Sequence, residues 1–131
     1  MTDVESVVPL ISKNISLNHL QPEQCEAKPL FWGNEEHLKE CVQALNSTVD
    51  FVVGADVVFD FDNFDGMMNI LDTLATSNSL KQGFFGFTHR FKDVEKWFAE
   101  MLAEKGFKIQ KDTFALEQMN VSDFTILVIN R

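Results

Sequence analysis

The stretch DFVVGADVVF, from Asp50 to Phe59, decides the fold. Its first half is an uninterrupted apolar run that ends in a glycine, an alanine and an acid, which is typical of a strand buried on both faces. Such strands occur in parallel sheets that helices cover on both sides. The residues from Asp56 to Phe59 then follow the carboxyl end of the strand, where open α/β sheets bind their ligands.

Helix and strand patterns alternate on both sides of this stretch. The expected elements are, in order, a helix within Val4–Leu17 that starts near Pro9, a strand over Cys25–Trp32, a helix from Asn34 to near Asn46, the strand Asp50–Asp56, a helix over Met67–Ala75, a strand over Gly83–Arg90, a helix over Phe91–Leu102 stopped by Gly106, and strands over Phe107–Leu116 and Phe124–Asn130. The alternation predicts an α/β fold with a mostly parallel sheet covered on both faces. Two successive strands at the end predict a closing antiparallel hairpin.

Length and charge restrict the class of protein. The 131 residues are enough for a single domain, and 45% hydrophobic with 24% charged residues is the balance of a folded globular chain. Twenty acidic against eleven basic residues give a net charge of −9, which repels nucleic acid and anionic membranes. The composition therefore favours a basic protein segment as partner.

Metal sites, membrane spans and export signals find no support in the sequence. Cys25 and Cys41 have no histidine at zinc-ligand spacing beside them. The acidic residues that begin at Asp60 do not form an EF-hand calcium loop. Phe64 takes the third-ligand position of such a loop, and Gly66 comes one place later than the glycine it requires. The amino-terminal residues lack a signal peptide pattern, and no apolar run approaches the length of a span. We expect the protein to be located in the cytoplasm or the nucleus.

Four motifs occur in a recognisable order: Thr2-Asp3, NISLN at Asn14–Asn18, LFWG at Leu30–Gly33, and the opening stretch Asp50–Phe59. This order resembles the lysine methyltransferases of methyltransferase family 16 over nearly the whole chain. The resemblance implies a Rossmann-like class I methyltransferase sheet, S-adenosylmethionine as the cofactor, and methyl transfer to a lysine of a protein substrate.

By this resemblance, Asp3, Trp32, Gly33, Ala55 and Asp56 are cofactor-binding residues. The Asp3 carboxylate would accept hydrogen bonds from the ribose hydroxyls. Trp32 would lie beside the adenine, where Gly33 lets the backbone turn closely. Two alternatives stay open: Asp3 caps the following helix or lies in a frayed terminus, and Trp32 belongs to the core.

The resemblance assigns Asp56 and Phe59 to the methyl-transfer channel, as the family's acid-x-x-aromatic motif. The acid would steer a lysine ammonium, and the aromatic ring would pack against the lysine stem. The family's usual tyrosine is phenylalanine here, so the hydroxyl is lost. In the alternative interpretation Asp56 only caps the next segment. His89 at the end of a strand is expected to be a polar edge residue, since amine methylation needs no dedicated base.

One part of the family pattern has no counterpart. The first strand and the acidic, glycine-rich loop that holds the methionine part of the cofactor should precede Thr2, and no G-x-G run occurs in the sequence. That strand would be the central one, between the strands that end at Asp3 and at Gly54, and its neighbours would expose unpaired edges. We expect a fragment of a longer domain; the alternative is a truncated paralogue that does not bind the cofactor. The functional alternatives are a non-catalytic interaction module and a methyltransferase that acts on a non-lysine acceptor.

Overall fold

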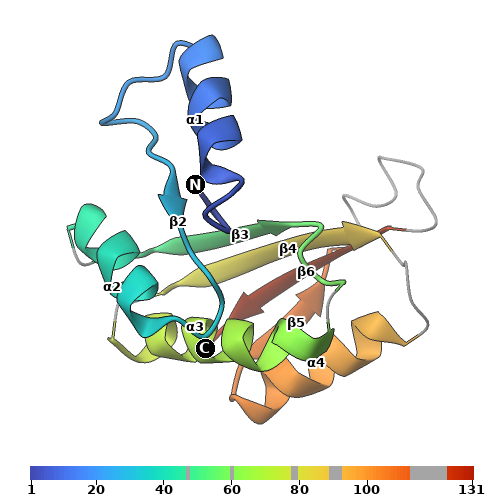
Figure 1. The fold of residues 1–131 in the computed structure, drawn as a ribbon. Helices are drawn as coiled ribbons and strands as arrows, with labels where there is room; N and C mark the ends of the chain where they lie inside the picture. The colour runs from blue at the N-terminus through green and yellow to red at the C-terminus, as the bar shows by residue number, and fades with distance from the viewer. Residues whose placement is uncertain (47, 60, 78–79, 89–92, 113–123) are drawn as a thin grey trace. The chain divides into compact units, whose positions relative to one another are not determined.

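The computed structural model describes residues 1–46, 48–59, 61–77, 80–88, 93–112 and 124–131. Figure 1 shows its helices and strands. The contacts divide the chain into two compact units, Met1–Ser47 and Thr48–Arg131. Several sequence predictions fall outside the described residues: those for Asp60, His89, Arg90, the helix start at Phe91, and the strand end beyond Asp112.

The first unit contains β1 (Thr2–Asp3), α1 (Val8–Leu17), β2 (Lys28–Pro29) and α2 (Glu35–Ala44). The strands β1 and β2 pair in parallel, with Thr2 opposite Lys28 and Asp3 opposite Pro29. The predicted strand over Cys25–Trp32 is thus only two residues long, and Pro29 has no N–H with which to extend a ladder. The helix α1 has a proline in its first turn, as predicted.

The helix α2 begins where the sequence indicates. The side-chain oxygen of Asn34 accepts hydrogen bonds from the backbone N–H groups of Glu36 and His37, each at 3.1 Å. These bonds satisfy two of the amide donors that every helix start leaves unpaired. Among the described positions of this unit, Leu38 of α2 is the one hydrophobic residue that is buried.

The second unit is a four-stranded sheet with two helices. It contains, in order, β3 (Phe51–Ala55), the 3₁₀ turn η1 (Phe61–Asn63), α3 (Phe64–Ser77), β4 (Gln82–Thr88), α4 (Val94–Glu104), β5 (Lys108–Lys111) and β6 (Phe124–Asn130). The strand order is β3-β4-β6-β5; β3 and β4 are parallel, and β6 is antiparallel to both β4 and β5. The predicted carboxy-terminal hairpin is confirmed. Gly106 follows α4 with φ at +82°, the left-handed value expected of its stop.

The core of this unit lies between one face of the sheet and the helices α3 and α4, which Figure 1 shows on the same side. Phe98 of α4 is fully buried at its centre. Its ring centroid lies 5.6 Å from that of Phe64 on α3, and 5.4 and 6.1 Å from those of Phe85 and Phe87 on β4. One aromatic side chain therefore joins both helices to the sheet.

The prediction that the strand Asp50–Asp56 is buried on both faces is wrong. Phe51 is 58% exposed and Val53 is 76% exposed, whereas Gly54 on the opposite face is buried. The reason is that α3 and α4 pack against the other face of the sheet, and no described helix of this unit covers the face that carries Phe51 and Val53. The neighbouring residues on the same face, Phe84 and Val128, are half-buried. We expected helices on both faces of the sheet. In the described part of this unit, helices cover one face.

Candidate functional site

Asp56 lies immediately after β3 in an unusual backbone conformation. Its φ is +57°, in the left-handed region that residues other than glycine enter at a cost in energy. Its N–H donates to the carbonyl of Gly86 at 2.7 Å, and its Oδ1 accepts from the hydroxyl of Thr88 at 3.2 Å. These bonds tie the end of β3 to β4 and orient the carboxylate at the carboxyl ends of both strands.

Thr88 is a candidate site residue that the sequence analysis did not single out. Its backbone N–H also faces Asp56, with the nitrogen 3.5 Å from Oδ1. Both of these contacts of the carboxylate run to β4. The available signal was a polar residue near the end of the predicted strand Gly83–Arg90.

The residues after Asp56 form a short loop with alternating burial. Val58 is buried and anchors the loop, whereas Phe59 is 44% exposed. Gly54, just before the loop, leaves room for this arrangement, because a Cβ there would lie 2.7 Å from both the Phe85 ring and the Val57 side chain. The structure thus places Ala55, Asp56 and Phe59 together at one end of β3.

Two more aromatic side chains follow this loop. Phe61 of η1 is 36% exposed and Trp97 of α4 is 39% exposed, and their ring centroids are 4.7 Å apart. We call this pair the aromatic patch. Trp97 falls within the helix predicted over Phe91–Leu102, and a helical period marks an apolar stripe without showing which of its members lies at the edge.

The remaining predicted site residues belong to the first unit. Asp3 is exposed at the end of β1, and its Oδ1 accepts from the N–H of Val4 at 2.7 Å. Because α1 begins only at Val8, with Val7 at its amino-terminal cap position, this bond does not cap the helix.

Trp32 and Gly33 occupy the turn between β2 and α2. The N–H of Asn34 donates to the carbonyl of Phe31 at 3.0 Å, and Gly33 at the third position of this turn has φ at +89°, which favours glycine. Trp32 is half-buried and so does not belong to the fully buried core. The turn therefore holds a partly exposed indole ring just after β2.

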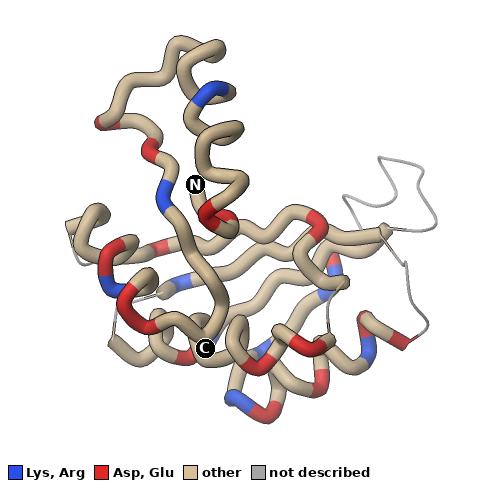
Figure 2. Tube along the Cα trace, viewed as in Figure 1, with Lys and Arg blue, Asp and Glu red and all other residues tan. Residues whose placement is uncertain are grey.

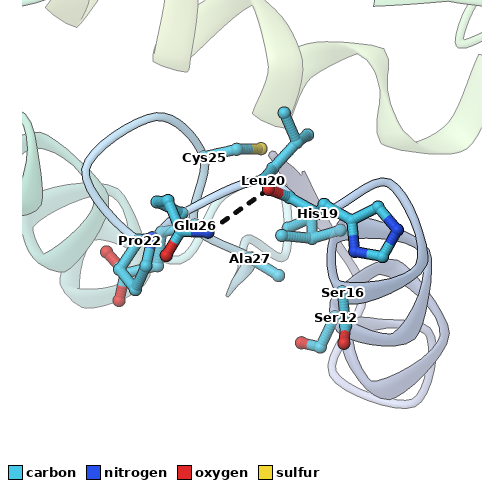
Figure 3. Close-up of a pocket in the computed structure, with 10 residues that line it drawn as sticks. Ser12, Ser16, His19, Leu20, Pro22, Cys25, Glu26 and Ala27 are labelled. Atoms are coloured by element: carbon cyan, nitrogen blue, oxygen red, sulfur yellow. Dashed lines mark hydrogen bonds between the residues drawn. The ribbon is translucent and has the colours of Figure 1, made fainter.

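The first unit also contains a cavity of about 670 Å³ between α1 and the segment before β2. Figure 3 shows Ser12 and Ser16 on α1, and Cys25 and Glu26 on the other side. The side-chain amide of Gln21 donates to the carbonyl of His19 at 3.3 Å, and both residues line the cavity. No predicted site residue lines the cavity. No group of three candidate metal ligands occurs within the described part of the chain.

The model of the lysine methyltransferase family matches residues 1–105. The chain belongs to the lysine methyltransferase family. No curated protein matches it.

Solved structures show the fold of this family member. The methyltransferase domain of bacterial CtHen1-CN shares 13% identity, with 99% of this chain and 76% of that chain covered and a TM-score of 0.68. The domain of bacterial CtHen1-C gives 11% identity, coverage of 98% and 74%, and a TM-score of 0.66. At these identities the likeness shows a methyltransferase fold, an open α/β sheet, and nothing of the substrate. No helix in the described ranges is long and apolar enough to cross a membrane.

Cys41 of this lysine methyltransferase family member is expected to resist alkylation. Burial raises the pKa of its thiol, and the Sγ atom lies 3.6 Å from the Pro29 carbonyl oxygen. Since the thiolate is the reactive form, Cys41 should react with iodoacetamide several times more slowly than Cys25 at pH 8. The ratio should fall as the pH rises and Cys41 ionises. Timed labelling followed by peptide mass spectrometry measures both rates, with the denatured chain as the control. Faster labelling of Cys41 in the folded chain would contradict the burial of its thiol.

Proposed function

We propose that the chain is an S-adenosylmethionine-dependent methyltransferase domain whose acceptor is a lysine amine of a protein substrate. The observation that carries the proposal is the position of Asp56. It occupies the acid of the family's acid-x-x-aromatic motif, and Thr88 holds its carboxylate at the carboxyl end of β3. Carboxyl ends of parallel strands are where such sheets bind their ligands.

Asp3, Trp32 and Gly33 fit the adenosine part of the cofactor. The carboxylate of Asp3 is exposed at the end of a parallel strand, so it is accessible to two adjacent hydroxyl donors. Trp32 offers a partly exposed flat ring, and the left-handed Gly33 forms the turn beside it. When bound, the cofactor supplies a methyl group on a positively charged sulfur. Within the 131 residues, no glycine-rich loop is assigned to its methionine part.

Asp56 and Phe59 fit the acceptor. The carboxylate attracts a lysine ammonium and holds the amine after that group loses its proton to water. The exposed ring of Phe59 packs against the lysine methylene stem. Because Phe59 has no hydroxyl, orientation of the amine rests on Asp56 and Thr88. These residues position the amine for in-line attack on the methyl carbon.

Charge and composition support a basic protein segment as the partner. The net charge of −9 disfavours nucleic acid and anionic membranes as binding surfaces. A substrate protein of the cytoplasm or the nucleus is the partner that we propose.

Titration calorimetry with S-adenosylmethionine tests the cofactor part of the proposal. We expect saturable binding by an extended form of the chain, joined to a first strand and a glycine-rich turn of the family pattern, because these have no counterpart in the 131 residues. Trp32→Ala should weaken this binding by about tenfold, the loss of a large stacked ring, and Glu5→Ala at an exposed position of the same unit should leave it unchanged.

Absence of binding by both the chain and its extended form would contradict the enzymatic proposal. It would favour the alternative of a non-catalytic interaction module. If the cofactor binds, mass spectrometry of lysates incubated with labelled cofactor identifies the modified residue, and labelling confined to other residue types or to small molecules would exclude a lysine acceptor.

A further inference from the structure

The aromatic patch is an exposed surface that the proposed chemistry does not use. Trp97 contacts Phe61 on one side and the fully buried Phe64 below it, with ring centroids 4.7 and 5.5 Å apart. These contacts fix the orientation of the indole, whereas 39% of the residue stays exposed. Since Phe64 and Phe98 already fill the core beneath, the outer part of the indole is available for a partner.

Acidic residues lie close in the chain to both members of the patch. Asp62 follows Phe61 directly, and Asp65 lies in the first turn of α3. On α4, Glu100 lies one turn after Trp97 and so beside it on the helix surface, and Asp93 is the residue just before the first turn of α4. All four residues are exposed, and the Cα trace in Figure 2 shows acidic positions along α3 and α4.

The basic residue next to Trp97 on α4 is already engaged. The ammonium of Lys96 lies 3.7 Å from a carboxylate oxygen of Glu100. This exposed pair offsets the charge of Glu100, and the exposed carboxylates of Asp65 and Asp93 contribute negative charge near the patch. A flat aromatic surface within a negative field is a site for a cationic side chain, because the ring face attracts cations and nearby carboxylates add to that attraction.

We propose that the aromatic patch binds a basic residue, arginine or lysine, of the substrate segment that carries the acceptor lysine. This inference rests on the proposed function, because it takes Asp56 as the place of the acceptor. Phe61 is five residues from Asp56, so even a fully extended chain would separate them by no more than about 18 Å. A substrate side chain within about five residues of the acceptor can therefore reach the patch while the acceptor lies at Asp56.

Two substitutions of Trp97 distinguish the contribution of its aromatic ring to binding from that of its apolar volume. Trp97→Leu keeps an apolar side chain and removes the ring, whereas Trp97→Phe keeps a ring. Fluorescence anisotropy measures the binding of a labelled peptide that contains one lysine and an arginine four residues away, without any cofactor. We expect Trp97→Leu to weaken binding by about three- to tenfold and Trp97→Phe to restore most of it. Leu10→Ala, at an exposed apolar residue outside the patch, is the control and should bind as the parent chain does.

A second peptide, with glutamine in place of arginine, completes a double-mutant cycle between Trp97 and the arginine of the peptide. If the arginine binds the patch, this peptide binds weakly and Trp97→Leu has no further effect on it. Equal binding of the arginine peptide by the parent chain and Trp97→Leu, or independent effects of the two changes, would overturn the inference. Binding is measured without methyl transfer, so a chain that binds as expected and transfers no methyl group contradicts only the proposed function. Methylation that does not depend on Trp97 contradicts only the role of the patch.

Discussion

Replacing Phe98 by alanine is expected to lower the free energy of unfolding of the Thr48–Arg131 unit by about 3–5 kcal/mol. Phe98 is fully buried, and its ring contacts the rings of Phe64, Phe85 and Phe87. The substitution removes its apolar surface and leaves a cavity between α3, α4 and β4. Since small domains are stable by only about 5–15 kcal/mol, much of the stability would be lost.

Urea unfolding followed by circular dichroism measures this change. The matched control is Phe51→Ala on β3, where the ring is 58% exposed, and its expected cost is about 1 kcal/mol or less. Similar losses for Phe51 and Phe98 would show that the face of the sheet carrying Phe51 is covered in solution.

Replacing Asp56 by alanine is expected to lower kcat/KM for methyl transfer by about 100-fold or more, in a chain that binds the cofactor. The change removes the charge that attracts the ammonium and the group that positions the amine. Asp56→Asn keeps a side-chain oxygen for the Thr88 hydroxyl and removes the charge, so it separates these two roles. Thr88→Val should cost less, about tenfold, because it loosens the carboxylate without removing it.

Transfer of a labelled methyl group to a lysine peptide measures these effects. Asp50→Ala is the control, since this acid precedes the other end of β3 and pairs with Lys81 at 2.6 Å. Wild-type transfer by Asp56→Ala would remove this residue from the mechanism. A loss in Asp50→Ala equal to that in Asp56→Ala would indicate a general effect of charge.

The features predicted correctly from the sequence depend on local chemistry. Asn34 starts α2 because its own side chain binds the next amides, and Gly106 follows α4 because glycine enters the left-handed region at little cost. The burial of β3 could not be predicted in this way. An apolar run shows that Phe51 and Val53 suit a covered surface, but other segments must supply the cover.

The residues of the candidate site differ in the same way: some are marked by local sequence, and others depend on contacts with distant segments. Asp56 was a candidate from the sequence because a short motif marks it. Thr88 was missed because its contact with Asp56 spans 32 residues and depends on the pairing of β3 with β4. The orientation of Trp97 likewise depends on Phe61 and Phe64, which come from a different element. Side chains brought together by tertiary contacts cannot be recognised from spacing alone.

The position of β6 has a consequence for how the chain acquires its structure during synthesis. β6 lies inside the sheet, between β4 and β5, although its residues, Phe124–Asn130, come last among the strands. Until they leave the ribosome, β4 lacks one neighbour and the core lacks Leu127 and Ile129. We therefore expect the second unit to complete its sheet only after translation has passed residue 130, and the phenylalanines of β4 to be accessible to chaperones in the nascent chain until then.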